Sequence, residues 1–207
     1  MPKKFEALPG KKEEKNWTRE QVLKWAKAMP VSTISKYGEH DDNPETWVDK
    51  TFTFETDGTI VVSGDLHLDQ MHTSALPLGI KTIRGDLSLA TNDFQSLSTI
   101  PESVGGSVDL RGNKLKTLDG KLSTVGGDLD LGSNRLTSLA GLPQIIKGNL
   151  FLQNNKVTSI PEGIGIGGSV IVEFNQKKLK EDALKKGYKV KIENYSMPPL
   201  MEDYQQE

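Results

Sequence analysis

A glycine-led segment recurs through the middle of this chain at a nearly constant interval. GDLHL begins at Gly64, GDLSL at Gly85, GSVDL at Gly106, GDLDL at Gly127, GNLFL at Gly148 and GSVIV at Gly168. Four successive spacings are 21 residues and the last is 20. A fixed period of this length indicates a repeat architecture, in which each unit packs mainly against its neighbours.

Apolar residues occupy the same places in every unit. Positions two and four after each glycine are Leu or Val in all six units, which is typical of a short strand with one face in the core. The remaining apolar columns are Phe94, Leu115, Leu136 and Val157; Leu76, Leu97, Leu118, Leu139 and Ile160; and Ile83, Val104, Val125 and Ile146, which we expect to close the turn. A single coil could bury almost nothing, so the pattern predicts a β-rich solenoid with one continuous core.

Two further columns have a structural interpretation. Asparagine stands seven places after the repeat glycine at Asn92, Asn113, Asn134, Asn155 and Asn175, whereas the first unit has Met71 there. An amide side chain both donates and accepts, so we expect a stacked ladder that satisfies backbone groups where the coil turns. The glycine pairs at 105–106, 126–127 and 167–168 are expected to be turn residues with positive φ.

The pattern LxLxxNxLxxL, seen in LDLGSNRLTSL and LFLQNNKVTSI, resembles the leucine-rich repeat. The short coils with IPE and GLP on their return side are similar to the bacterial and bacteriophage subtype. The resemblance covers roughly Gly64 to Gln176. It implies a curved solenoid with a parallel sheet on its concave side, used for recognising proteins, and it does not fix a partner.

Segments on both sides of the repeats are expected to cap the ends of the solenoid. Thr18–Gln21 forms a capping box that predicts a helix ending before Pro30, and TFTFE and TIVV predict a hairpin around Thr56–Gly58. A helix-binding role for the Trp17/Trp25 stripe is an alternative to the cap. After the repeats we expect a helix over Glu181–Lys186, with Gly187 ending it, and a closing strand in YKVKIENY.

The sequence therefore predicts five segments. They are a mobile basic tail (1–15), an N-terminal cap of helix and hairpin (16–63), leucine-rich repeats (64–176), a C-terminal α/β cap (177–195) and a mobile tail (196–207).

Composition limits the possible functions. The chain has no cysteine, which excludes disulfides, thiolate metal sites and thiol nucleophiles. Its formal net charge of −2 gives no general attraction to nucleic acid or to an anionic membrane. There is no apolar run of about 18 residues and no apolar leader, so we expect a cytoplasmic protein, with non-classical secretion left open.

Function is expected on the outward residues of the strands. These are His67, Ser88, Asp109, Asp130, Phe151 and Ile171 three places after the glycine, and Asp69, Ala90, Arg111, Gly132, Gln153 and Glu173 five places after it. They vary freely within a strict frame, which is typical of a recognition surface. The candidate partner-binding set is Asp109, Arg111, Asp130, Phe151, Gln153, Ile171 and Glu173, with Phe151 and Ile171 as the apolar anchor. Packing of that pair under the C-terminal tail is the alternative.

The first residue after each glycine offers a different possibility. Asp65, Asp86, Ser107, Asp128, Asn149 and Ser169 form either an acidic ridge for a ligand or a set of short acceptors for backbone N–H groups. We favour the second interpretation. A divalent-metal site of His67 with Asp65, Asp69 and Asp86 is a weaker candidate, because neighbouring strands present a floor and not a convergent pocket.

The sequence thus predicts a non-enzymatic protein-binding module without metal or cofactor, and a monomer when unbound. An inhibitor or adaptor of a host protein is the role that a phage or bacterial origin would imply. The alternative is an acidic decoy that occupies a nucleic-acid-binding groove. Six strands about 4.8 Å apart offer a floor of roughly 240 Å², well below the ~800 Å² that each partner contributes to a standard interface. The C-terminal flank is therefore expected to join the contact.

Overall fold

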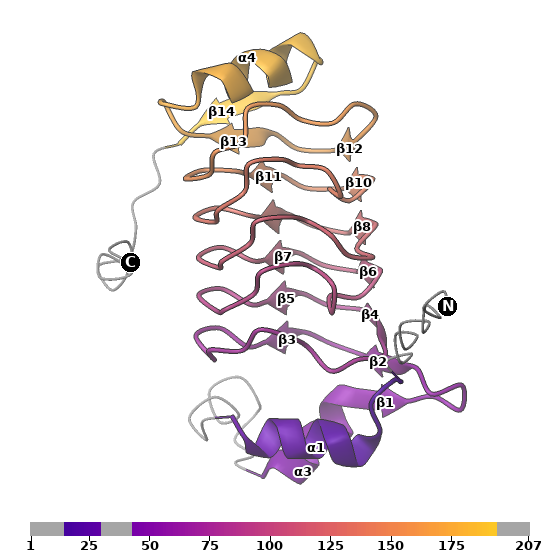
Figure 1. The fold of residues 1–207 in the computed structure, drawn as a ribbon. Coiled ribbons are helices and arrows are strands. Elements are labelled where there is room, and N and C mark those ends of the chain that lie inside the picture. The colour runs from indigo at the N-terminus through magenta and orange to yellow at the C-terminus, as the bar shows by residue number, and fades with distance from the viewer. Residues whose placement is uncertain (1–14, 30–42, 194–207) are drawn as a thin grey trace, which may run out of the picture.

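The computed structural model describes residues 15–29 and 43–193 and shows a solenoid of stacked coils (Figure 1). The predicted tails fall outside this range, apart from Lys15. Successive coils lie one above another in a nearly straight column, with an N-terminal cap at one end and a helix at the other (Figure 1). None of the described helices is long and apolar enough to cross a membrane.

Five coils each contribute one strand to each of two sheets, and these stacked strands run parallel; the sixth coil contributes β13 alone. Sheet A runs in the order β1 (Phe52–Phe54), β2 (Ile60–Val62), β4 (Ile80–Ile83), β6 (Ser103–Val104), β8 (Thr124–Val125), β10 (Ile145–Ile146) and β12 (Gly165–Ile166). Sheet B runs in the order β14 (Val190–Ile192), β13 (Val170–Val172), β11 (Leu150–Phe151), β9 (Leu129–Asp130), β7 (Val108–Asp109), β5 (Leu87–Ser88) and β3 (Leu66–His67). Sheet B holds the strands expected from the glycine-led pattern. Sheet A joins the expected hairpin strands, β1 and β2, to residues such as Val104 and Val125 that were expected only to close a turn.

Glycine occurs at the repeat positions for a different reason from the one that the sequence suggests. The prediction of positive φ at the glycine pairs is wrong, because the described glycines with positive φ lie elsewhere, at positions such as Gly112 and Gly141. The reason is close stacking, because a Cβ on Gly106 would lie 2.0 Å from the Asp86 carboxylate and one on Gly105 would lie 2.1 Å from the Arg84 carbonyl oxygen. Only a residue without a side chain lets neighbouring coils approach this closely.

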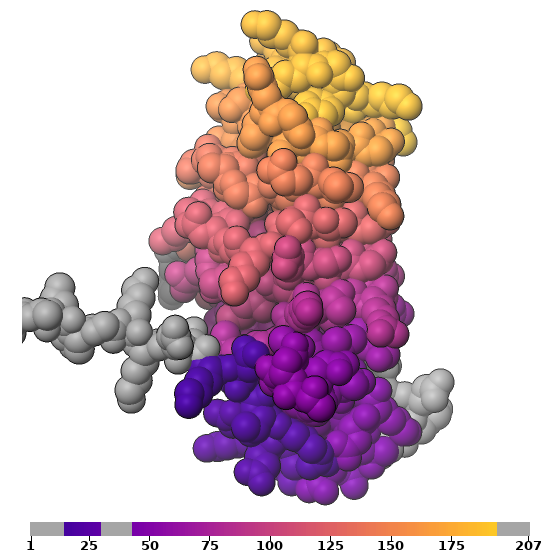
Figure 2. Space-filling view, turned by 90° about the vertical axis from the view of Figure 1, so that its right-hand side faces the viewer, coloured from indigo at the N-terminus to yellow at the C-terminus, as the bar shows by residue number. Residues whose placement is uncertain are grey.

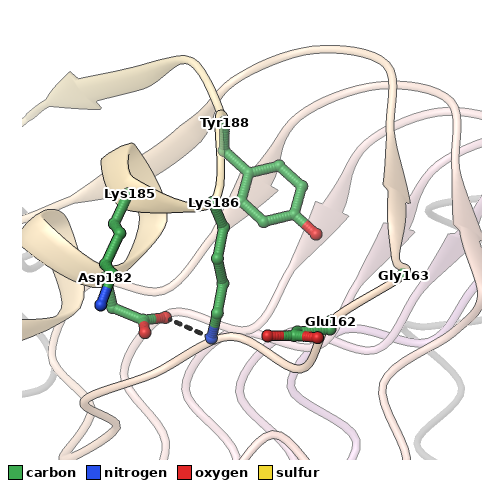
Figure 3. Close-up of a pocket in the computed structure, with 6 residues that line it drawn as sticks. All are labelled: Glu162, Gly163, Asp182, Lys185, Lys186 and Tyr188. Carbon is green, nitrogen blue, oxygen red and sulfur yellow. Dashed lines mark hydrogen bonds and ion pairs between the residues drawn. The ribbon is translucent and has the colours of Figure 1, made fainter.

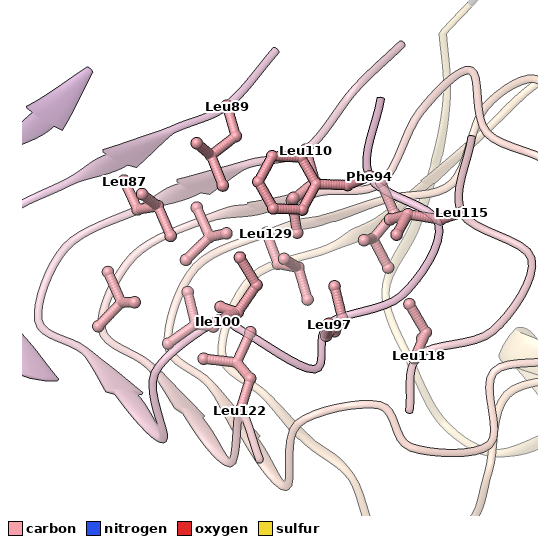
Figure 4. Packing of buried hydrophobic residues seen from close by; sticks show 14 of the residues in the cluster. Leu87, Leu89, Phe94, Leu97, Ile100, Leu110, Leu115, Leu118, Leu122 and Leu129 are labelled. Atoms are coloured by element: carbon pink, nitrogen blue, oxygen red, sulfur yellow. The ribbon is translucent and has the colours of Figure 1, made fainter. Parts of the chain in front are cut away.

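The core runs the length of the stack between the two sheets. Leu87, Leu110 and Leu129 lie on successive coils and meet the columns of Phe94 and Leu97 (Figure 4). Phe94 is fully buried, as are most members of these columns. Viewed from the sheet A side, the coils form successive bands from the N-terminal to the C-terminal end (Figure 2).

The asparagine ladder, defined as Asn92, Asn113, Asn134 and Asn155, joins each coil to the next. In each coil, the amide nitrogen donates to a strand carbonyl of its own coil and to one of the preceding coil. Asn134 Nδ2 donates to Leu110 O at 2.9 Å and to Leu131 O at 3.0 Å, and its Oδ1 accepts from Leu115 N at 3.1 Å. The predicted ladder is thus present in these coils.

The last coil departs from the predicted column. Asn175 is exposed, and the neighbouring Gln176 takes the ladder position, donating to Leu152 O at 2.9 Å. Strand β13 stays aligned with β11, with Leu150 opposite Val170, so the last coil has one more residue than the others between its strand and the ladder position. The longer glutamine side chain restores the contact.

The N-terminal cap contains the predicted helix and hairpin and one further helix. Helix α1 (Arg19–Lys27) begins at the Thr18 capping box, and β1 pairs antiparallel with β2. Helix α3 (Pro44–Thr51) was not predicted; Asn43 caps it and Pro44 opens it. Trp25 lies 6.3 Å from both Trp47 and Phe52 between ring centroids, so this ring of the Trp17/Trp25 stripe packs within the cap.

The C-terminal cap is a helix followed by a parallel strand. Helix α4 (Lys177–Lys185) starts four residues before the expected segment, and Gly187 follows it with a φ of 83°. Strand β14 then adds to β13, with Ile171 paired with Lys191. The helix lies across the end of the stack, where Leu179 and Ala183 are buried (Figure 1).

Candidate binding surface

The first residue after each repeat glycine forms a second row of hydrogen bonds, here called the acceptor ladder. Asp65 Oδ1 accepts from Asp86 N at 2.8 Å, Asp86 Oδ1 from Ser107 N at 2.6 Å, and Asp128 Oδ1 from Asn149 N at 2.6 Å. Each side chain therefore binds the backbone of the next coil. These bonds support the structural interpretation of the column over an acidic ridge.

The outward residues of sheet B stand between the two ladders. The register places Asp109 opposite Asp130, Asp130 opposite Phe151, and Phe151 opposite Ile171 on neighbouring strands. The structure thus brings these predicted residues into one row across β7, β9, β11 and β13. Arg111 and Glu173, at the carboxyl ends of two of these strands, are exposed and partly exposed respectively.

Two members of the predicted set are buried. Ile171 is 1 % exposed and Gln153 is 5 % exposed, so the expectation that Ile171 faces solvent is wrong. Ile171 lies on β13 between Phe151 on β11 and Lys191 on β14. The added strand β14 makes β13 an interior strand of sheet B, which removes the open edge beside Ile171. Phe151 remains partly exposed.

Asp109 and Asp130 are partly buried carboxylates. Burial raises the pKa of Asp109 to about 6, while the hydrogen bond from Arg111 N, 3.0 Å from Asp109 Oδ1, opposes the shift. The guanidinium of Arg111 pairs with Asp109 Oδ2 at 2.8 Å. Burial also raises the pKa of Asp130, whose Oδ1 accepts from Gly132 N at 2.8 Å. Both carboxylates are therefore held in an environment that disfavours their charge.

The metal candidate around His67 has little geometric support. His67 Nε2 lies 3.8 Å from Asp65 Oδ2, whereas Asp69 Oδ1 accepts from Ser88 Oγ at 2.6 Å and from Ala90 N at 2.8 Å. Within residues 15–29 and 43–193 there is no group of three or more His, Asp or Glu side chains placed to hold a metal ion.

A pocket beside helix α4 is lined by Glu162, Gly163, Asp182, Lys185, Lys186 and Tyr188 (Figure 3). Its polar groups mainly join the cap to the last coil. Lys186 Nζ donates to Asp182 Oδ2 at 2.9 Å and to the carbonyl oxygen of Ile160, and Asp182 accepts from Ile160 N at 2.8 Å. Tyr188 donates to Ile164 O at 3.1 Å. These bonds explain the pocket as an attachment of the cap.

One feature of the surface was missed from the sequence. Lys191 joins the outward row beside Ile171 because β14 pairs with β13. The closing strand was expected, but a strand pattern does not name its neighbour. Gly132 belongs to the column of six variable outward residues, and it is the one glycine in that column.

Comparison with protein-family models, with curated proteins and with solved structures finds nothing that matches this chain. The surface must therefore be interpreted from its own geometry.

Proposed function

We propose that the chain is a leucine-rich-repeat protein of the short bacterial and bacteriophage type and acts as a non-enzymatic protein-binding module. It recognises a partner protein through the outer face of sheet B and the C-terminal flank. The 21-residue coils, the leucine columns and the asparagine ladder support the repeat assignment.

The observation that carries the binding proposal is the contrast within sheet B. The two ladders repeat the same backbone contacts from coil to coil, while the residues between them change from Asp109 and Asp130 to Phe151. Phe151 is a partly exposed aromatic residue directly beside a partly buried carboxylate. A partly exposed aromatic residue is typical of an interface centre, and charged groups beside it are typical of the polar rim.

The flank adds area where the sheet alone is too small. Phe174 is 71 % exposed in the turn that leads into α4, and Leu184 and Ile192 are also exposed large apolar residues. All three belong to the C-terminal end of the stack, close in sequence to β13, α4 and β14. An interface that extends from Phe151 to this end would reach beyond the floor of the sheet.

The experiment is an affinity capture with three matched baits, read by quantitative mass spectrometry on a lysate of the organism that encodes the chain. The baits are the wild-type protein, Phe151→Ala and Lys121→Ala, which changes an exposed residue in the loop before β8. We expect the wild-type and Lys121→Ala baits to capture a partner that uses the outer face of sheet B. Phe151→Ala should weaken the binding free energy of that partner by more than about 1–2 kcal/mol. Equal capture by all three folded baits would contradict the proposal.

The salt dependence of that capture separates the binding module from an acidic decoy. A decoy that imitates nucleic acid loses affinity steeply between about 50 and 200 mM salt, because its contacts are mainly ionic. A partly apolar interface centred on Phe151 changes much less. A steep loss, with no effect of Phe151→Ala, would favour the decoy.

A further inference from the structure

A column of positively charged side chains follows the turn at the end of the sheet B strands. The residue directly after each member of the asparagine ladder lies in this column, and three successive coils place a cation there: Lys114, Arg135 and Lys156. In the last coil Gln176 takes the ladder position, and the next residue is again a lysine, Lys177, which opens α4. We call these four residues the basic column.

Backbone hydrogen bonds hold the column in register from coil to coil. Arg135 N donates to Leu115 O at 2.9 Å, and an equivalent bond of 2.8 Å starts from Lys156 N. Stacked strands lie about 4.8 Å apart, so the four cations extend over roughly 14 Å. The side chains of Arg135, Lys156 and Lys177 are exposed, and that of Lys114 is partly exposed, so all four are open to a ligand in solution.

The first coils show that neighbours in this column reach one another. The same place holds His72 and then Asp93, and Asp93 Oδ1 lies 2.8 Å from Lys114 Nζ while its Oδ2 lies 3.8 Å from His72 Nδ1. Opposite charges therefore pair across one coil junction. From Lys114 onward the column stacks like charges at the same spacing, and these repel one another.

The protein itself does not compensate these charges. Among residues 15–29 and 43–193, no ion pair joins Arg135, Lys156 or Lys177 to a carboxylate, whereas Lys114 shares Asp93. The whole chain has a formal net charge of −2, so the column is a local exception to its charge balance. A ligand with several negative charges in a row would neutralise all four cations together.

The column suits a short acidic peptide segment better than a polynucleotide. A nucleic acid carries a phosphate at every nucleotide and would continue past Lys114 onto the carboxylate of Asp93. None of the four column residues is aromatic, and the ring that follows Asp93, that of Phe94, is fully buried, so the column offers no surface on which bases stack. An extended peptide rises about 3.3 Å per residue, so about five residues match the length of the column.

We propose that the basic column binds an acidic segment of a partner protein, whose carboxylates pair with the four cations. This inference rests on the proposed protein-binding function, because it adds a contact of stated chemistry beyond the turn that ends the sheet B strands. The contact is separate from the one centred on Phe151.

The test titrates the blocked peptide acetyl-hexa-aspartate-amide into ¹⁵N-labelled full-length protein at about 20 mM salt, where ionic contacts are weakly screened. The matched probes are acetyl-hexaserine-amide, which has no charge, and hexathymidylate, which has phosphates in place of carboxylates. We expect saturable shifts of the Arg135 and Lys156 amides with hexa-aspartate, none with hexaserine, and weaker binding of hexathymidylate. Absence of saturable shifts with hexa-aspartate would overturn the proposal. Hexathymidylate binding as tightly as hexa-aspartate, or more tightly, would overturn the assignment to a protein segment.

Charge-removing variants locate the site. Arg135→Gln and Lys156→Gln should each weaken hexa-aspartate binding by about two- to fivefold, as exposed ion pairs do, and the double variant should weaken it by about tenfold. Lys147→Gln is the control, since Lys147 is an exposed lysine that directly follows β10 on sheet A. It should change affinity by less than about twofold. Equal weakening by Lys147→Gln would reveal a general effect of net charge and would contradict a site at the column.

Arg135→Asp separates binding from folding. The new carboxylate would lie between Lys114 and Lys156 and pair with its neighbours, as Asp93 pairs with Lys114. We expect a melting temperature equal to or above that of the wild type, together with a loss of hexa-aspartate affinity of more than about tenfold. A lower melting temperature would show that like charges are not stacked at Arg135, and an unchanged affinity would exclude the column as the binding site.

The outcome is separable from that of the proposed function. If hexa-aspartate gives no saturable shift while Phe151→Ala still loses its captured partner, the basic-column inference fails and the binding proposal stands. If hexa-aspartate binds but capture is indifferent to Phe151, the chemistry of the basic column stands and the interface on sheet B fails.

Discussion

The two ladders that border sheet B both form hydrogen bonds to the backbone of a neighbouring coil, but they differ in the residue types that occur in them. Three of the four members of the asparagine ladder are buried, with exposed fractions of 5 %, 5 % and 8 % at Asn92, Asn113 and Asn134, and Asn155 is partly buried. The acceptor ladder is more exposed, apart from the buried Ser169 of the last coil, and uses aspartate, serine or asparagine in turn, as at Asp86 and Ser107.

The difference follows from the number of bonds and from solvent access. Each buried asparagine donates to carbonyls of two coils and also accepts, so only a side chain with both functions serves. Each member of the acceptor ladder needs one oxygen, and water can satisfy whatever remains. The comparison teaches that burial, and not the presence of a hydrogen bond, fixes the residue type.

The largest effect on stability is expected when a carboxylate of the kind found in the acceptor ladder replaces an amide of the asparagine ladder. Asn134→Asp keeps the size of the side chain but points carboxylate oxygens at the carbonyls of Leu110, Leu131 and Gly132, which now receive the amide protons. We expect a loss of about 3–5 kcal/mol in the free energy of unfolding at pH 7, since an uncompensated charge is buried. Urea unfolding at pH 7 and pH 4 measures it, and the loss should shrink at the lower pH as the carboxyl protonates. Asn134→Ala, which only removes bonds, should cost about 1–3 kcal/mol; an aspartate variant as stable as wild type would break the comparison.

A carboxylate between the ladders gives the next effect. The pKa of Asp109 is raised from its ordinary 3.8 to about 6, so its charged form is disfavoured in the folded state. The charge of Asp109 therefore lowers the free energy of unfolding, and the whole of this cost is present above about pH 6. The cost disappears as the pH falls below 3.8. The shift corresponds to about 3 kcal/mol at most, at about 1.36 kcal/mol per pKa unit.

Asp109→Asn should accordingly stabilise the protein at pH 7.5 by up to about 3 kcal/mol, and by close to nothing at about pH 3.5. The pKa of about 6 already includes the attraction of Arg111, which lowers it, so the loss of that ion pair is contained in the expected gain. Denaturant unfolding of both proteins at several pH values tests this. A variant less stable than wild type at pH 7.5 would show that the ion pair outweighs the burial of the carboxylate.

The backbone beside the asparagine ladder supplies a third test. The residue before each asparagine of the ladder has a left-handed backbone: Thr91, Ser133 and Asn154 have φ between 51° and 57°, and Gly112 has φ of 66°. Gln70, which precedes Met71 in the first coil, is also left-handed, with φ of 60°. A β-branched residue in this region is strained. We expect Thr91→Gly to raise the unfolding free energy by about 1 kcal/mol, and the reciprocal Gly112→Thr to lower it by at least as much. Thermal unfolding of both variants measures the pair, and opposite signs are required.

The smallest effect is expected in the acceptor ladder. Asp128→Asn retains an oxygen for Asn149 N and should change stability by less than about 0.5 kcal/mol, whereas Asp128→Ala should cost about 1 kcal/mol. Thermal melts of the two variants compare them directly. If Asp128→Asn were as damaging as Asn134→Ala, burial would not be what separates the ladders.

Much of the fold could be predicted because its period repeats. A column such as Leu87, Val108 and Leu129 states the core position several times, so one irregular residue does not hide it. The coil strands of sheet A were missed because most have only one residue in an apolar column, as Val104 in Ser103–Val104, and so show no alternation; of this sheet only the β1–β2 hairpin was predicted. Helix α3 carried its signals, Asn43 and Pro44, but has a single buried residue, Val48, and hence little periodicity.

The candidate surface was less predictable for a related reason. The alternation of residues correctly places Asp109, Asp130 and Phe151 in one row, because the register of equal coils is fixed. It cannot tell that Ile171 is buried, since that depends on β14 arriving at the edge of sheet B from 20 residues further on. Nor can it show that Gln153 lacks a partner for its oxygen, which requires coordinates.

The hydrogen bonds of both ladders run from one coil to the next and are the same at every interior junction, which has a consequence for how such a chain can change in length. A coil such as residues 106–126 receives from its predecessor what it delivers to its successor, so a tandem copy inserted between equals meets complementary neighbours on both sides. In the part of the chain that the structure describes, the caps are hydrogen-bonded to the end coils, as in β2 with β4 and β13 with β14, and these contacts would be undisturbed. The length of the solenoid can thus change without a change in its coils. Duplication or loss of one coil would lengthen or shorten the recognition surface by one strand of sheet B.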